Sequence, residues 1–219
     1  MEVILKGSTS LAVVVEAIRT CWDSFGKSDS FYPDVAPYPY FSLGQKDKKL
    51  IETVMKNNHT STLEHLVYNF KINGISRLVL QEFARHRIAS PSVKSSRYTL
   101  KELKNEEEFN EISPEDIERA MKYINSSGND HVDKFSVMAL ENLRKAIIMG
   151  IPNDVAKYCL PECYKVDLMW SVNARSLCNF LQLRMAKEAH YEIRELAKKI
   201  YEKIPQEHKF IFEKFVCGE

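Results

Sequence analysis

The stretch from Arg85 to Tyr98 reads RHRIASPSVKSSRY: a basic triplet, then seven residues, then Ser-Ser-Arg-Tyr. Adjacent cationic or protonatable side chains repel one another, and a bound anion removes that repulsion. Arginine offers a planar fork of donors that matches phosphate oxygens, and serine hydroxyls add further donors. A helix that ends in basic residues would account for the triplet alone. The hydroxyls and the arginine that follow favour a phosphate-binding segment.

The sequence on either side of this stretch predicts a helix before it and an extended segment after it. Ser76 is suited to cap a helix that carries the triplet near its end. Pro91 opposes continuation of that helix, so residues 91–100 are expected to form an extended loop or strand. Residues 66–72 alternate apolar and polar side chains, which is typical of a half-buried strand, and residues 2–5 form a second candidate strand.

Most of the remaining chain shows helical spacing or helix-start signals, such as Ser-Pro-Glu-Asp from position 113. Two of the predicted helices, over residues 115–125 and 131–148, are rich in Lys and Glu and are expected on the surface. Residues 31–41 hold three prolines and five aromatic side chains and are expected to form a loop. Helices are predicted over residues 10–25, 47–56, 115–125, 131–148, 152–158, 174–185 and 188–203.

Length and composition indicate a globular protein of one domain or two small ones. The chain has 219 residues, of which 44% are hydrophobic, with 7 glycines and 8 prolines. A net charge of +1 predicts no general polyanion-binding surface, and no apolar run approaches the roughly twenty residues of a membrane span. The first residues, MEVILKGS, lack the pattern of a signal peptide.

The five cysteines show no disulfide-like spacing, which indicates a reducing cytoplasm. Cys159 and Cys163 are four residues apart, as a metal pair could be. Pro161 lies between them, however, and no CxxC or nearby histidine pair completes a zinc site. We therefore expect no metal site and buried, inert thiols.

The predicted helix from Ala174 carries an arginine in an apolar stripe. Leu177, Phe180 and Leu181 share one helix face, and Arg184, seven residues after Leu177, falls on the same face. Burying a charge in an apolar stripe costs several kcal/mol of desolvation free energy unless an anion or a hydrogen-bonded partner compensates for it. Two alternatives stay open at this point: the helix has ended by position 184, or the side chain reaches out to water.

Arg175 and Arg184 are nine residues apart, which places them about half a turn out of phase on a straight helix. One compact pocket can hardly use both from one chain. Either the helix bends, or its two faces serve different pockets. The second option predicts sites that are shared between subunits.

A basic triplet, seven residues and a serine resemble the signature of the flavin-dependent thymidylate synthases. The likeness runs from near the start of the chain to about Arg194, and the triplet together with the block from Val172 is specific. The further segments that resemble this family are AIRTCW (17–22), HTSTLEH (59–65), SRLVLQEFARHR (76–87), LP (160–161) and VNARSLCNFLQLR (172–184).

The resemblance implies an α+β fold: a central antiparallel or mixed sheet flanked by long helices, forming a single domain over residues 1–219. It implies an intertwined homotetramer whose active sites are assembled from several chains. The implied reaction is reductive methylation of deoxyuridine monophosphate (dUMP) to thymidine monophosphate in the cytoplasm. Methylenetetrahydrofolate would give the carbon, and FAD reduced by NADPH would give the hydride. Nucleic acid and membranes are not among the implied partners.

The family's motifs also imply roles for particular residues. Arg184 matches the arginine that stabilises negative charge on the uracil, and is the expected catalytic residue. Ser95 is expected to bind substrate and not to act as a nucleophile, since no His–acid relay is evident around it. The residues implied to bind substrate are Glu82, Phe83, Ala84, Arg85, Val93, Lys94, Ser95, Ser96, Arg97, Lys157 and Arg184.

A second set matches the flavin-binding positions, where a positive field would favour the anionic reduced flavin. Arg175 and Asn179 are four residues apart and share a helix face, as a common ligand requires. His59 and Glu64 lie in the matching HTSTLEH segment, although without the family they would read as structural polar residues. The residues implied to bind the cofactor are Ser61, Arg85, His86, Arg87, Val93, Asn173, Ala174, Arg175 and Asn179.

Five positions depart from the family pattern. Ser92-Val93 stand where Asn-Glu is usual, so Val93 offers only backbone contacts. Glu82 stands where Gln is frequent, and Cys21 replaces a usual Ser. Lys157 stands where Arg is usual, which keeps the charge and loses the fork. We expect activity to survive with altered nucleotide affinity.

Two other classes of function compete with this interpretation. A nucleotide phosphohydrolase would need clustered acids for Mg²⁺, and the acids here lie mainly on the predicted surface helices. A nucleic-acid-binding module would need a broad basic face or stacking aromatics, which a pI near 7.6 argues against. The yellow colour of a flavoprotein would distinguish the favoured interpretation from both.

Overall fold

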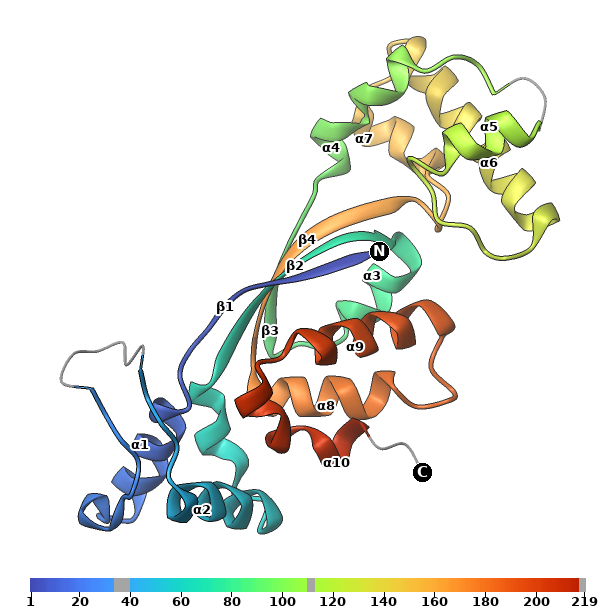
Figure 1. The fold of residues 1–219 in the computed structure, drawn as a ribbon. Helices are drawn as coiled ribbons and strands as arrows, with labels where there is room; N and C mark the ends of the chain where they lie inside the picture. Colours follow the sequence, from blue (N-terminus) through green and yellow to red (C-terminus); the bar gives the residue numbers. More distant parts are fainter. Residues whose placement is uncertain (34–39, 110–112, 217–219) are drawn as a thin grey trace. The chain divides into compact units, whose positions relative to one another are not determined.

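A computed structural model describes residues 1–33, 40–109 and 113–216. It contains a four-stranded antiparallel sheet with the order β1-β2-β4-β3 (Figure 1). Within the described ranges, no helix combines the length and the apolar character needed to cross a membrane. The strands are β1 (Glu2–Ser8), β2 (Val67–Ser76), β3 (Ala89–Val93) and β4 (Lys165–Asn173).

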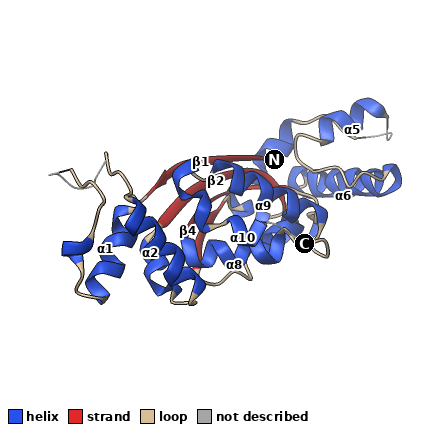
Figure 2. Cartoon of the chain, turned by 60° about the horizontal axis from the view of Figure 1, so that its bottom comes forward, coloured by secondary structure: helices blue, strands red, loops and turns tan. Residues whose placement is uncertain are grey.

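Helices precede or follow each strand along the chain, and they make up most of the regular structure (Figure 2). The α-helices are α1 (Ala12–Cys21), α2 (Gln45–Lys56), α3 (Arg77–Phe83), α4 (Ser96–Thr99), α5 (Pro114–Ala120), α6 (Asp130–Ile148), α7 (Asn153–Ala156), α8 (Ala174–Arg184), α9 (Tyr191–Lys203) and α10 (Glu213–Val216). The 3₁₀ helices are η1 (Phe25–Lys27), η2 (Thr60–His65), η3 (Leu100–Asn105), η4 (Lys157–Cys159) and η5 (Gln206–Ile211). The predicted α+β class is therefore confirmed, with an antiparallel sheet.

The pairing of β2 with β4 shows why the sheet is antiparallel. The backbone N–H of Ala174 donates to Leu66 at one end, and that of Arg77 donates to Tyr164 at the other. The predicted strands at 66–72 and 2–5 are present, and both run on by several residues, because pairing with a neighbouring strand continues past the alternating pattern.

The chain forms two compact units, each built from separate stretches. Unit 1 comprises residues 72–85 and 92–168 together with Met1, and unit 2 comprises residues 2–71, 86–91 and 169–219. The single domain expected over residues 1–219 stays a prediction.

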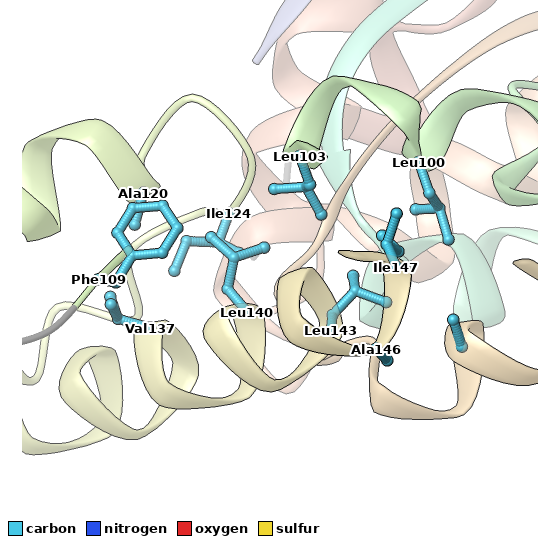
Figure 3. Packing of buried hydrophobic residues seen from close by; sticks show 11 residues of the cluster. Leu100, Leu103, Phe109, Ala120, Ile124, Val137, Leu140, Leu143, Ala146 and Ile147 are labelled. Atoms are coloured by element: carbon cyan, nitrogen blue, oxygen red, sulfur yellow. The ribbon is translucent and has the colours of Figure 1, made fainter. Parts of the chain in front are cut away.

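Unit 1 contains a hydrophobic core built mainly by residues of η3, α5, α6 and α7 (Figure 3). The side chain of Ser113 caps α5 and that of Asn129 caps α6, as helix-start chemistry requires. The predicted surface helices at 115–125 and 131–148 begin at these caps, but one face of α6 is buried. The helices therefore build a core as well as a surface. The core residues are Leu100, Leu103, Phe109, Ala120, Ile124, Val137, Leu140, Leu143, Ala146, Ile147 and Ala156.

Unit 2 is organised around α8, which packs against α9, α10 and η2, while α9 also contacts β1. Aromatic rings from three elements form a buried row. Phe70 on β2 contacts Trp170 on β4 (centroids 6.1 Å apart), and Trp170 contacts Phe180 on α8 (5.2 Å). All three are at most 1% exposed. The row ties α8 to these strands.

Two predictions around the basic triplet were wrong in detail. The predicted helix is capped by the side chain of Ser76, but it ends at Phe83, before the triplet begins. The chain must become extended by Ala89, where β3 joins the sheet, so the helix ends before it. The segment predicted as extended over 91–100 is a strand only to Val93, because the Ser95 hydroxyl then accepts from the Arg97 N–H and starts the short helix α4.

The predicted loop at 31–41 is described only at its ends, because residues 34–39 lie outside the described ranges. Phe31 pairs with Ser42 in an isolated antiparallel bridge, and Tyr32 packs edge-on against Phe41. The described ends of this segment therefore pack on each other.

Candidate functional site

Helix α8 carries several of the predicted site residues, and its N-terminus is capped by a side chain. The side chain of its N-cap, Asn173, accepts from the Ser176 N–H at 2.8 Å. Leu177, Phe180 and Leu181 are fully buried, which confirms the apolar stripe. The helix ends at Arg184, so the arginine is its last residue.

Arg184 contacts the basic triplet. Its Nε donates to His86 Nε2 at 3.0 Å, and the residue is half-buried. The His86 ring packs edge-on against Phe180, with centroids 4.9 Å apart. The stripe therefore ends in an arginine held by a hydrogen bond, and two segments 98 residues apart in the chain meet at one point.

Arg175 lies on the other side of α8 and is exposed. Its Nη1 donates to Glu64 Oε1 at 2.6 Å, which joins α8 to η2. The two arginines of this helix thus have different surroundings, as their phase predicts. Sharing of the site between subunits remains a prediction.

The same side of α8 lines a cavity of about 200 Å³ in unit 2. Arg175 and Asn179, four residues apart on one helix face, both line it. Thr60 on η2 and Lys214 on α10 complete a polar lining. The lining residues are Met55, Asn58, Thr60, Leu63, Arg175, Cys178, Asn179, Gln182, Lys214 and Phe215.

Sequence reasoning missed Asn58, Gln182 and Lys214 in this lining. Gln182 could have been found, because it lies one turn beyond Asn179. Lys214 has no such signal, because it lies outside every segment that resembles the family.

Ser61 faces a different hollow, of about 520 Å³, which lies between η2 and α1. Cys21 and Glu16 of α1 line it from the opposite side. The neighbouring Thr62 is 9% exposed, and its hydroxyl has no hydrogen-bond partner within the described ranges. Helix η2 thus stands between two hollows, one lined by Thr60 and the other by Ser61.

In unit 1, the predicted phosphate-binding residues meet around a carboxylate. Arg97 Nη2 lies 2.8 Å from Asp154 Oδ2, and Lys157 Nζ lies 3.4 Å from Asp154 Oδ1. Asn153 Nδ2 also donates to the Arg97 carbonyl at 2.6 Å. Although partial burial opposes the shift, the Lys157 hydrogen bond and the Arg97 charge hold the pKa of Asp154 below its ordinary value. Sequence reasoning missed Asp154, despite its place one helical turn before Lys157.

The other predicted substrate residues of unit 1 have varied surroundings. Phe83 is 1% exposed, so its side chain belongs to the core and only its backbone could meet a ligand. Glu82 is half-buried, whereas Ala84 and Arg85 are exposed. Val93 and Lys94 are exposed at the end of β3, where the Lys94 N–H donates to the Asp167 carbonyl at 2.8 Å.

Two predicted cofactor residues of unit 2 are constrained. Ala174 is fully buried, and its N–H donates to the carbonyl of Leu66, so neither its side chain nor its amide is open to a ligand. The Asn173 side chain already caps α8. Arg87 is exposed and could reach a ligand with its whole side chain.

The expectation of buried thiols was wrong for the cysteines of unit 1. Cys159, the last residue of η4, is exposed, and Cys163, in the turn that follows, is half-buried. Cys178 of α8 is buried, and burial raises the pKa of its thiol to about 12. Among the described residues, no group of three or more His, Cys, Asp or Glu side chains could hold a metal ion.

The chain is similar to known proteins along its whole length. The family model described as thymidylate synthase complementing protein matches residues 2–208. A flavin-dependent thymidylate synthase of Wolinella succinogenes is 55% identical over 213 residues, covering 97% of each chain. One of Helicobacter pylori is 49% identical over 215 residues, covering 97% of this chain and 98% of that protein. A crystal structure of thymidylate synthase X from Helicobacter pylori with FAD and dUMP superposes with a TM-score of 0.90, at 47% identity, over 100% of both chains.

Proposed function

Because this chain belongs to the family of flavin-dependent thymidylate synthases, we propose that it converts dUMP to thymidine monophosphate, with methylenetetrahydrofolate as the carbon donor and NADPH as the reductant of bound FAD. The observation that carries the proposal is the contact between His86 of the triplet and Arg184 of α8. The two sequence blocks that resemble the family most specifically converge there. The related crystal structure with FAD and dUMP supports the same ligands for this chain.

The cluster around Asp154 fits the phosphate of the nucleotide. The guanidinium of Arg97 and the ammonium of Lys157 both contact the Asp154 carboxylate. Two cations that share one carboxylate are close enough together to share a phosphate instead. Ser95 and Ser96 begin α4 beside Arg97 and add hydroxyl donors. We assign the phosphate to these four residues, with Lys94, Val93 and the chain from Glu82 to Arg85 lining the rest of the nucleotide site.

The cavity beside α8 fits part of the flavin cofactor. Its lining offers two cations, Arg175 and Lys214, and the amides of Asn179 and Gln182, a donor set that suits a pyrophosphate. A cavity of about 200 Å³ is too small for a whole dinucleotide. The remainder would extend toward the other predicted residues, Ser61, His86, Arg87, Asn173 and Ala174. When bound, FAD supplies hydride-transfer chemistry.

Arg184 would act on the pyrimidine base. The base must become nucleophilic at C5, and negative charge then develops on N3 and on its carbonyl oxygens O4 or O2. A guanidinium already held in place stabilises such charge without a cost of reorganisation at the moment of reaction. We assign Arg184 as the catalytic residue for this reason.

We further propose a homotetramer with active sites shared between chains. The different surroundings of Arg175 and Arg184 on one helix support this arrangement, as does a cavity that holds only part of FAD. The free cysteines fit a reducing compartment, and we propose the cytoplasm.

Tritium release from C5-labelled dUMP tests the function directly. The purified chain should be yellow, with the absorbance bands of oxidised flavin, and should release tritium only with the folate donor and reduced nicotinamide present. Omitting each component in turn separates the roles of folate and NADPH. A colourless protein that hydrolyses nucleotides with Mg²⁺ would contradict the proposal.

A further inference from the structure

The hydrogen bond between His86 and Arg184 has a direction that side-chain chemistry settles. A guanidinium carries only donors and keeps its charge at any physiological pH. The Arg184 Nε therefore donates, and the His86 Nε2, 3.0 Å away, accepts. An imidazole that accepts at Nε2 is neutral and carries its proton on Nδ1.

The imidazole is held by a ring contact as well as by the hydrogen bond at its nitrogen. Phe180 packs against it at an interplanar angle of 69° and is itself fully buried against Trp170. Phe180 and Arg184 are four residues apart, so they lie on one face of α8. A single turn of this helix thus carries both the ring that packs against His86 and the guanidinium that His86 holds.

The bond engages the Nε of Arg184, the guanidinium nitrogen nearest the main chain. A hydrogen bond at Nε restrains the plane of the guanidinium group, which also carries two terminal amino groups. Those terminal groups form part of the planar fork that recognises a planar or anionic ligand. Their direction is therefore tied to the position of the imidazole.

We propose that His86 is a positioning residue for Arg184: its neutral imidazole fixes the plane of the guanidinium that the pyrimidine base meets. The inference rests on the proposed function of this chain. It gives the middle residue of the triplet a task in the reaction of the nucleotide, besides its expected contact with the flavin. It also explains why a packing ring lies one turn before Arg184.

The test compares two substitutions in the full chain loaded with FAD. His86→Phe keeps a ring against Phe180 and removes the acceptor, whereas His86→Gln offers an amide oxygen near the position of Nε2. The kcat and the KM for dUMP are measured by tritium release, and the flavin content by absorbance. We expect His86→Phe to lower kcat by about a hundredfold through misplacement of Arg184, and His86→Gln to stay within about fivefold of the native chain. Equal losses in the two variants, or a near-native His86→Phe, would overturn the inference.

A double-mutant cycle tests the same hydrogen bond by also changing its donor, Arg184. Arg184→Lys removes the Nε donor and leaves the triplet intact. Calorimetry at saturating FAD gives the affinity for dUMP, so a variant that binds flavin weakly is still tested. We expect His86→Phe to weaken dUMP binding in the native background and to have no further effect in the Arg184→Lys background. Additive losses would show that His86 acts independently of Arg184.

The native chain separates this inference from the proposed function. If it holds no flavin and releases no tritium, the function itself is refuted. If it is active and the two His86 variants behave alike, only the positioning role is refuted.

Discussion

Unit 1 holds Arg97 and unit 2 holds Arg184 in different ways. In unit 1, Arg97 and Lys157 share Asp154 at the surface, and the side chains of Arg97 and Asp154 are 59% and 47% exposed. In unit 2, Arg184 is bonded to an imidazole that packs against the fully buried Phe180. Exposed ion pairs contribute little to stability, whereas a contact braced by a packed core cannot shift without disturbing that core.

This difference matches the tasks that we assign to the residues. A residue that binds phosphate can exchange one anion for another, so a weak surface pair suits it. A residue that stabilises a transition state must already be in place, so a braced position suits it. Arg175 follows the first pattern, because it pairs with Glu64 at the surface and is assigned to cofactor binding.

The largest effect is expected at the braced arginine. Arg184→Ala should lower kcat by a factor on the order of a thousand, as loss of a preorganised charge does, while the protein keeps its flavin. Tritium release and flavin absorbance measure the two properties. Near-normal thymidylate production by this variant would show that Arg184 is not the catalytic residue. The contrast between Arg184 and the surface cation Arg97 would then have no functional meaning.

The next effect concerns the bracing ring. Phe180→Ala should lower the free energy of unfolding by about 3–5 kcal/mol, because it opens a cavity beside Trp170. Phe180→Leu, which fills more of the space, should cost less stability and still loosen His86. Urea denaturation measures the stability, and kcat of the leucine variant measures the loosening. A leucine variant with native kcat would show that the ring is not needed to hold the imidazole.

A smaller effect is expected at Ser95, which both caps α4 and is assigned to the phosphate. Ser95→Ala should lower kcat/KM for dUMP by about tenfold, the loss of one hydrogen bond to a charged group, and should leave measurable activity. Ser95→Thr keeps the hydroxyl and serves as the control. Complete loss of activity, together with a covalent adduct trapped in the native enzyme, would instead make Ser95 a nucleophile.

The smallest effect is expected at the carboxylate between the two cations. Asp154→Asn should tighten dUMP binding by about twofold to fivefold, because the neutral amide neither repels the phosphate nor competes for its partners. Calorimetry with dUMP measures this, and deoxyuridine, which lacks the phosphate, should bind the variant and the native chain equally.

A second variant controls for the loss of a negative charge alone. Glu108→Gln removes a charge from unit 1, and its carboxylate lies 2.9 Å from Lys145, which is not among the predicted nucleotide-binding residues. It should change dUMP affinity less than Asp154→Asn does. Weaker dUMP binding by Asp154→Asn would mean that the carboxylate positions Arg97 and Lys157 for the phosphate. Asp154 would then act on its cations as His86 is proposed to act on Arg184.

The helices, the caps and the main strands were largely predictable. Ser76, Ser113 and the stripe from Leu177 are local signals, because caps and helical periodicity depend on residues a few positions apart. The ends of elements were less predictable. The helix from Ser76 ends before the triplet, because the chain must be extended from Ala89 onward to pair in the sheet.

The residue types of the site were also present in the sequence: the triplet, the hydroxyls beside Arg97, and two arginines on opposite faces of one helix. The partners were not. Asp154 beside Arg97, Glu64 beside Arg175 and His86 beside Arg184 are pairs 57, 111 and 98 residues apart. Local chemistry in the sequence sets which groups can bind an anion and where a helix presents them. Only the tertiary structure decides which groups meet, because contacts between distant segments depend on how the whole chain packs.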